Sequence, residues 1–365
     1  MVGRIKCLLF CIVLLLSEIC VYSQQDTSLI SAKHYNIALG NMDKQRKANI
    51  NVGLVGDLYN LNGLNFNLVS SWIRQNGKGV NWSGAGAFTQ NNMSGMQYAS
   101  VVNIVGGKMT GLQLSTILNI ARQTKGVQIS SFNNMNASAL RGFQLCGIEN
   151  ISAGVEKGMQ LAGVTNISIN NMQGFQFSPF NYADTLNGLQ IGLINISTEQ
   201  QKGVQIGVFN YSRNNTAKKI GLVNLSPLTR IQMMFFGGNA SKINLAARFK
   251  NNNTYNILGF GTHYMGLDEK FSGSFFYRLG YWKNIFNEKW AIYGDLGFSH
   301  IETFQQNDLE TPERLYSLNT NLSLEYQRFE HFGFFVGTGY GVDRYYQHNK
   351  NYRKSFLLKI GLVLF

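Results

Sequence analysis

A short motif recurs along the middle of the chain at intervals of 14 to 16 residues, and this repeat restricts the fold more than any other feature. The motif reads Gly, apolar, Gln, apolar, small, then apolar, Asn, apolar, small, as in GLQIGLINIS from Gly188. We count twelve units, which begin at residues 47, 63, 79, 95, 111, 126, 142, 158, 174, 188, 203 and 217. The spacing is less than half of what a helix pair needs. Each unit therefore predicts a short strand and a turn.

Stacking of these units predicts a β-solenoid, with equivalent residues of successive coils about 4.8 Å apart. Leu193 and Ile194 break the alternation and predict a bend, with Asn195 at a corner in left-handed backbone geometry and Ile196 turning inward. Two ladders of amide side chains should follow from the stacking. The first contains the recurrent glutamines: Gln97, Gln113, Gln128, Gln144, Gln160, Gln176, Gln190 and Gln205. The second contains the recurrent asparagines: Asn103, Asn119, Asn150, Asn166, Asn181, Asn195, Asn210 and Asn224.

The last third of the chain has a different composition. Residues 230–365 contain 29 of the 46 aromatic residues, and apolar and polar residues alternate cleanly. Trp290, Ile292 and Leu296 share one face, whereas Tyr293 and Asp295 share the other. An apolar outer face, a polar inner face and aromatic residues near the strand ends are typical of membrane β-barrels. We expect eight strands, near 231–238, 242–250, 254–265, 271–282, 289–302, 315–328, 332–345 and 353–365.

The sequence therefore predicts an all-β chain with a signal peptide at 1–23, a lead-in at 24–46, a repeat domain at 47–228 and a small antiparallel membrane barrel at 229–365. Three other architectures remain open. The repeats could be strands of one large barrel that contains both regions, although Glu149 would then face lipid. The last third could also be a soluble β-sandwich. An odd number of strands would place the repeat outside the cell.

The first 23 residues have the layout of a secretory signal peptide, with Arg4 and Lys6 before an apolar stretch and Ser23 at a plausible cleavage site. A lipoprotein at Cys20 is the alternative. After cleavage the chain keeps only Cys146, so no internal disulfide is expected. The formal net charge of +13 on an exported chain favours anionic lipid head groups or acidic glycans over nucleic acid as its counter-charge.

No catalytic, cofactor-binding or metal-binding residues are predicted. The five histidines do not have the spacing of metal ligands. They are His34, His263, His300, His331 and His348. Two clusters of basic residues predict solvated turns or lipid head-group contacts. The first comprises Lys218, Lys219 and Arg230, and the second His348, Lys350, Arg353 and Lys354. A hydrolase on a solenoid scaffold would need carboxylates at matching positions of adjacent coils, whereas Glu149, Glu156, Asp184 and Glu199 occupy different positions.

The repeat units resemble a surface-repeat family of exported bacterial proteins found in Leptospira and in Bacteroidetes, and the likeness covers about residues 95–227. The C-terminal strand, KSFLLKIGLVLF, resembles the last strand of Gram-negative outer-membrane barrels, although its more apolar face is that of Leu364 and Ile360 rather than that of Phe365. The repeat resemblance implies an envelope or surface location and does not indicate an activity.

We expect a non-enzymatic surface protein without a cofactor, whose repeat forms a structural or adhesion-type surface. Its expected partners are outer-membrane lipid and a glycan or a host or envelope protein, and not nucleic acid. The competing hypothesis is a transport pore of about twenty strands in which the repeats form part of the wall.

Overall fold

The computed structural model describes residues 32–41, 47–200, 202–214, 217–262, 272–286, 288–303, 314–329, 331–347 and 349–364, with only the backbone for 32–41, 303 and 328. The predicted signal peptide lies outside these residues, as do Cys20, His263 and His348. Within them, no helix is long and apolar enough to span a membrane. The chain divides into two compact units, Met1–Gly207 and Val208–Phe365.

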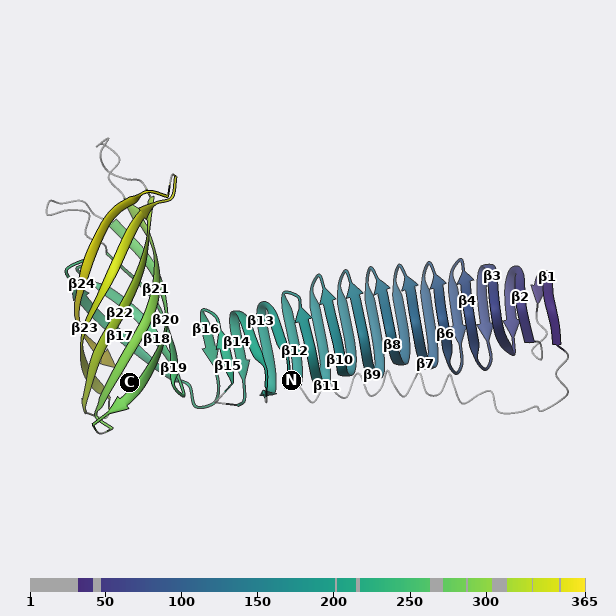
Figure 1. Ribbon diagram of the computed structural model, residues 1–365, viewed down its shortest axis with the longest axis horizontal. Coiled ribbons are helices and arrows are strands. Elements are labelled where there is room, and N and C mark those ends of the chain that lie inside the picture. Colours follow the sequence, from purple (N-terminus) through teal and green to yellow (C-terminus); the bar gives the residue numbers. More distant parts are fainter. Residues whose placement is uncertain are drawn as a thin grey trace. The chain divides into compact units, whose positions relative to one another are not determined.

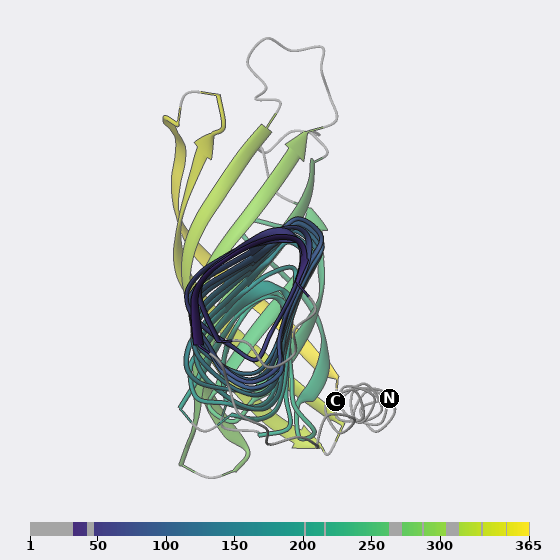
Figure 2. The ribbon, with the colours of Figure 1, turned by 90° about the vertical axis from the view of Figure 1, so that its right-hand side faces the viewer.

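The first unit is a parallel β-solenoid of about eleven turns, fewer than the twelve repeat units counted in the sequence (Figure 1). The coils overlie one another when the stack is viewed from the end that holds residues 32–41 (Figure 2). Its strands are β1 (Ala32–Asn41), β2 (Lys47–Leu58), β3 (Asn60–Ile73), β4 (Gly77–Ser83), β5 (Gly86–Thr89), β6 (Met93–Ala99), β7 (Val102–Ser115), β8 (Leu118–Ser130), β9 (Asn133–Cys146), β10 (Glu149–Ala162), β11 (Thr165–Phe177), β12 (Phe180–Leu186) and β13 (Leu189–Gln200). The next strand, β14 (Val204–Ser212), crosses the boundary between the units.

The repeat sets the register of the solenoid, because the same motif position pairs with itself in the next coil. Gln160 pairs with Gln144, and Asn150 pairs with Asn134. The first strand, β1, pairs in parallel with β2, so the stack begins before the first repeat unit at residue 47.

The predicted glutamine ladder forms inside the solenoid. Each side-chain amide donates to the Oε1 of the glutamine one coil earlier, at 2.7–2.9 Å, from Gln205 back to Gln113. These side chains are fully buried. Each rung therefore satisfies one donor and one acceptor that would otherwise be costly to bury.

Gln97 was wrongly assigned to this ladder. It pairs in register with Gln113, but its Nε2 donates to the backbone oxygen of Ala87 at 2.7 Å. In the coils before it the same position holds Asn: the side chain of Asn51 donates to Asn65 at 2.6 Å, and that of Asn65 to Asn81 at 2.7 Å. The interior therefore keeps an amide at this position although the N-terminal repeats match the motif poorly.

The asparagine ladder also forms, but not at a left-handed corner. Asn150 donates to Asn166 at 3.0 Å, and Asn166 to Asn181 at 3.1 Å. No ladder asparagine among the described residues has a positive φ. The side chains of Asn195 and Ser197 point inward and are fully buried, so the prediction that Ile196 turns inward was wrong. The alternation within the strand assigns the interior to the polar residues.

Buried apolar side chains of successive coils also form clusters inside the solenoid. Leu140, Val155, Met172 and Leu186 form one buried cluster of this kind. Shorter clusters occur in earlier coils, around Met93 and Met109 and around Leu58 and Ile73. The interior therefore combines apolar clusters with two hydrogen-bonded amide columns.

The motif glycine allows the coils to approach closely. Gly142 has a φ of +140°, a region that side chains rarely adopt, and a Cβ on it would lie 2.0 Å from the backbone oxygen of Gly126. A side chain here would force adjacent coils apart, which explains why this motif position requires Gly.

The second unit contains the end of the solenoid and a closed antiparallel barrel. Two short strands, β15 (Lys218–Ile220) and β16 (Val223–Leu225), follow β14. The barrel strands are β17 (Arg230–Gly238), β18 (Asn244–Asn251), β19 (Thr254–Thr262), β20 (Ser272–Ile285), β21 (Trp290–Thr303), β22 (Arg314–Phe329), β23 (Phe332–Tyr345) and β24 (Asn351–Leu364). Pairing of β17 with β24 closes the barrel, and all eight predicted strands are confirmed.

Because the barrel closes on itself, the alternative of one large barrel with repeat strands in its wall is wrong. The repeat strands pair in parallel in a separate sheet, and the barrel strands pair antiparallel. The hypothesis of a pore with about twenty strands fails for the same reason.

The last coil is hydrogen-bonded to the barrel within the second unit. Asn224, at the end of the asparagine ladder, donates to Asn256 of β19 at 3.2 Å. Asn251 donates to the backbone oxygen of Asn224 at 2.9 Å, and the Tyr277 hydroxyl donates to that of Gly221 at 2.7 Å. The barrel thus provides the polar partners that a further coil would otherwise supply.

Candidate functional site

The outside of the solenoid carries an apolar stripe along one corner, one residue per coil. We call it the corner stripe: Val69, Ala85, Val101, Ile117, Phe132, Ile148, Val164, Pro179 and Leu193. Backbone hydrogen bonds between successive coils align these positions, as between Val164 and Ile148 at 3.1 Å. Its members other than Ala85 and Pro179 are 42–58% exposed. A continuous apolar surface of this kind marks an interaction site more often than it occurs by chance.

The strand beside the corner stripe extends the apolar surface. The two apolar residues that flank each ladder glutamine point outward, so Leu145, Met159 and Phe177 are exposed. In the N-terminal coils the equivalent positions stack aromatic rings, with Trp82 and Tyr98 5.9 Å apart and nearly parallel. The motif therefore sends its large apolar side chains to the outside and its amides to the inside.

The outer face of the barrel is also apolar. Leu296, Ile360 and Phe260 are 65–68% exposed. Aromatic pairs lie near both ends, with Trp290 against Tyr326 toward one end and Phe298 against Tyr316 toward the other. An apolar band between two aromatic girdles is the surface of a barrel that is embedded in a bilayer.

The barrel interior is filled rather than open. An apolar cluster, which includes Phe236, Phe276, Phe335 and Met234, occupies much of it. The rings of Phe276 and Phe335 meet that of Phe236 edge-on, each at 5.8 Å. The expected polar inner face is therefore confirmed only in part, because large apolar side chains share the interior with charged ones.

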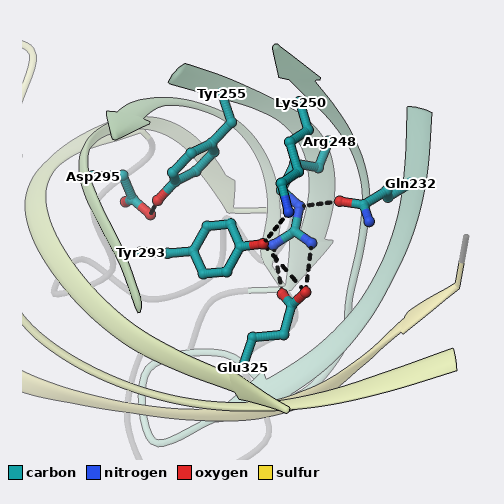
Figure 3. Close-up of polar contacts among 7 residues, drawn as sticks. All are labelled: Gln232, Arg248, Lys250, Tyr255, Tyr293, Asp295 and Glu325. Carbon is teal, nitrogen blue, oxygen red and sulfur yellow. Dashed lines mark hydrogen bonds and ion pairs between the residues drawn. The ribbon is translucent and has the colours of Figure 1, made fainter. Parts of the chain in front are cut away.

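A buried ion pair crosses the barrel between β18 and β22 (Figure 3). The Arg248 guanidinium donates to both carboxylate oxygens of Glu325, at 2.7 and 3.1 Å, and its Nε donates to the Oε1 of Gln232 at 2.7 Å. The two charged side chains are 2% and 4% exposed. Tyr293 donates its hydroxyl to Glu325 at 3.3 Å and lies beneath the guanidinium.

A second polar group surrounds Asp295. Its carboxylate accepts from the hydroxyl of Tyr255 at 2.8 Å and from the amide of Asn321 at 2.6 Å. Lys359 donates to the Oδ1 of Asn321, while the guanidinium of Arg278 packs over the ring of Phe276 at 4.9 Å. Side chains from β19, β20, β22 and β24 thus surround Asp295 of β21 inside the barrel.

A cavity of about 900 Å³ lies at the end of the barrel where the short turns are. Its wall includes the end of the Arg248 network, namely Lys250, Tyr293 and Glu325, and the ring of Trp282. Rim residues include Arg230, Asn252, Asn284 and Lys289.

Among the described residues, the carboxylates and the histidine singled out in the sequence make separate contacts. Among the described residues no three His, Cys, Asp or Glu side chains are placed to hold a metal ion. Glu149 accepts from Asn133 at 3.1 Å, and partial burial raises the pKa of its carboxyl. Glu156 forms an exposed ion pair with Arg141. His300 lies 3.1 Å from Glu302 and 3.0 Å from the hydroxyl of Tyr346.

The basic clusters of the sequence separate in the structure. Lys219 is buried and donates to the backbone oxygen of Leu225 at 2.8 Å, and its burial lowers the pKa of its ammonium to about 8. Arg230 lies at the cavity rim. Arg353 pairs with Asp343 at 3.3 Å, whereas Lys354 is exposed.

The charged residues inside the barrel were not identified as a site from the sequence. Arg248, Glu325 and Asp295 occupy inward positions of strands that were predicted correctly, so a charge on the inner face was the available signal. Which inward residues meet depends on the stagger of the strands around the barrel. The alternation within one strand does not contain that information.

No protein-family model matches the chain, and no curated protein matches its sequence. Among solved structures, it is similar to the N-terminal β-barrel domain of Pseudomonas aeruginosa OprF, at 12% identity over 37% of this chain and 95% of that one, with a TM-score of 0.28. It is similar to Neisserial surface protein A, at 8% identity over 37% and 93%, with a TM-score of 0.26. The attachment invasion locus protein Ail of Yersinia pestis matches at 18% identity over 37% and 92%, with a TM-score of 0.20.

Proposed function

We propose that the chain is a non-enzymatic outer-membrane protein in which the barrel is an anchor and the repeat is a ligand-binding surface within the cell envelope. The corner stripe carries this proposal. The coils stack through their interior amides, their buried apolar side chains and their glycines, so the exposed apolar row on the outside is not needed for stacking. Binding of a partner is the use that accounts for it.

The surface of the barrel supports the membrane anchor. Its exposed leucines, isoleucines and aromatic rings would be costly in water and are favoured in lipid. The packed interior, with Phe236 at its centre and the Arg248–Glu325 pair across it, supports an anchor rather than a channel for solutes.

The lengths of the connections support a repeat that faces the periplasm. At one end of the barrel the strands join through 252–253, 286–289 and 330–331; at the other they join through 239–243, 263–271, 304–313 and 346–350. Bacterial outer-membrane barrels keep their short turns in the periplasm. The chain enters β17 at the end with the short turns, which favours an envelope component over a host surface as the partner.

Apart from Phe132, the members of the corner stripe are aliphatic, which favours a protein over a glycan as that partner. Sugar recognition relies on aromatic faces and on polar groups, whereas Ile117, Ile148, Val164 and Leu193 offer only aliphatic surface. We therefore propose an envelope protein that lays an apolar segment along the coils.

Protease shaving of intact cells tests this arrangement. One epitope tag is inserted in the repeat turn near Glu199, and a second between Thr303 and Arg314, with membrane fractionation alongside. We expect the loop tag to be cut on intact cells and the repeat tag only after the outer membrane is permeabilised. Loss of the repeat tag from intact cells would place the repeat outside and favour adhesion.

A triple variant tests the binding surface itself. Changing Phe132, Ile148 and Val164 to Ser removes three successive members of the corner stripe without touching either ladder. Circular dichroism should remain unchanged, while photo-crosslinking from a probe at Ile117 to envelope proteins should fall. Crosslinking that persists at the level of the unmodified stripe would contradict the proposal.

A further inference from the structure

The cavity at the end of the barrel with the short turns has an unbalanced charge in its wall. Glu325 accepts two hydrogen bonds from Arg248, which neutralises its carboxylate. Lys250, from the same strand as Arg248, lines the cavity beside them. The carboxylate of Glu325 is therefore paired with Arg248, and the second cation, Lys250, lies beside this pair.

Lys250 is held in place without a carboxylate of its own. Its ammonium lies 3.4 Å from the centre of the Trp282 ring and donates to the Tyr293 hydroxyl at 2.8 Å. No carboxylate among the described residues forms an ion pair with it. The ring and the hydroxyl fix the position of the ammonium, so it is oriented for an acceptor from outside the chain.

The rim adds further positive charge and hydrogen-bonding groups. Arg230 and Lys289, both exposed, line the cavity together with the carboxylate of Glu288. The amides of Asn252 and Asn284 line it as well. With a volume of about 900 Å³, the cavity has room for a molecule considerably larger than an inorganic ion.

We propose that this cavity binds a small molecule bearing a carboxylate or phosphate group, whose anion pairs with Lys250 and whose polar body contacts the rim amides. A charge-assisted hydrogen bond from Lys250 would supply the missing counter-charge. Trp282 forms the wall beside the anion. The same chemistry is available from a soluble acidic metabolite and from a phospholipid head group.

The test uses the full-length protein in a maltoside detergent, with tryptophan fluorescence and calorimetry as readouts. Glucuronate and inorganic phosphate are titrated as anionic probes, and glucose as the neutral probe. We expect saturable binding of glucuronate that weakens as salt rises, because screening reduces the attraction. Glucose should bind at least tenfold more weakly.

Two substitutions on the same barrel identify the anchor. Lys250→Met should reduce glucuronate affinity at least tenfold, and Lys250→Arg should retain most of it. Lys283→Met is the matched control, because Lys283 is exposed, lies on β20 near the same end of the barrel and does not line the cavity. Heat-dependent migration in detergent gels verifies that each variant keeps a closed barrel.

Adding phosphatidylglycerol to the micelles shows whether the bound anion belongs to a soluble molecule or to a phospholipid head group. Displacement of glucuronate at a low lipid fraction identifies a head group as the source of the anion, and undisturbed binding identifies a soluble molecule. Absence of saturable anion binding by the folded protein would overturn the proposal. So would a folded Lys250→Met variant that binds glucuronate as tightly as the original.

Discussion

The solenoid and the barrel both bury polar side chains and expose large apolar ones, although the barrel interior also holds the cluster around Phe236. The two regions pair their buried polar groups in different ways. The solenoid repeats one neutral amide contact from coil to coil, as between Gln160 and Gln144. The barrel uses unique charged contacts, above all Arg248 with Glu325. A repeat can reuse a neutral contact at every step, whereas a charge needs a partner of opposite sign that a uniform ladder cannot provide.

The difference extends to the outer surfaces. The apolar exterior of the barrel matches a lipid environment, and aromatic pairs such as Trp290 with Tyr326 lie near its ends. Among the described residues, the members of the corner stripe other than Ala85 and Pro179 remain 42–58% exposed. Exposed apolar side chains therefore predict a membrane around the barrel and a partner molecule on the solenoid.

Glu325→Gln should have the largest effect, because it leaves the guanidinium of Arg248 buried without a counter-charge. We expect the barrel to lose about 3–5 kcal/mol of unfolding free energy. Urea unfolding followed by tryptophan fluorescence measures this loss. Glu156→Gln is the control: its ion pair with Arg141 joins side chains that are 45% and 60% exposed, and its loss should cost at most about 1 kcal/mol. Equal losses in both variants would refute the role of burial.

Gln160→Leu should break the glutamine ladder in the middle of the solenoid. It removes the acceptor of Gln176 and the donor to Gln144, which leaves two buried amide groups with fewer partners. We expect a loss of about 2–4 kcal/mol, about 1–2 kcal/mol for each of the two groups, because Gln176 keeps its hydrogen bond to the backbone oxygen of Tyr182. Thermal unfolding followed by circular dichroism measures it. Gln173→Leu, at an exposed position, should be close to neutral, and a similar loss there would show that the ladder is not the cause.

Lys219 should give the smallest effect, a dependence of stability on pH. Burial lowers the pKa of its ammonium to about 8 in the folded chain, against an ordinary value of 10.5. The unfolded chain therefore binds the extra proton between these values, and stability should rise as pH increases from 8 to 10.5. Lys219→Met should abolish the rise and be more stable near neutral pH. Urea midpoints measured across this range test the sign, and a fall with rising pH would contradict it.

The sequence predicted the fold because both regions carry a period that extends over many residues. Near-constant spacing of Gly and Gln predicted stacked coils, and alternation in segments such as 289–302 predicted the barrel strands. The side toward which each residue points was harder to predict in the solenoid. Ile196 was placed inside because apolar residues usually are, but the ladder of Asn195 takes the interior.

The interior of the barrel could not be predicted at the level of contacts. Arg248 and Glu325 are 77 residues apart and meet because of how β18 and β22 are staggered in the closed sheet. The cavity likewise depends on the ends of several strands and on the turns between them. Membership of the surface-repeat family stays a prediction.

Because every coil contacts only its two neighbours through equivalent atoms, the number of coils is a free parameter of this architecture. Removing residues 142–157 would join Arg141 to Gly158 and would place Gln160 against Gln128 and Asn166 against Asn134, with the same rungs as before. Duplication of the segment would add a coil in the same way. The gene can therefore lengthen or shorten the solenoid by about 4.8 Å at a time. Such changes leave both the first coil and the bonds to the barrel intact.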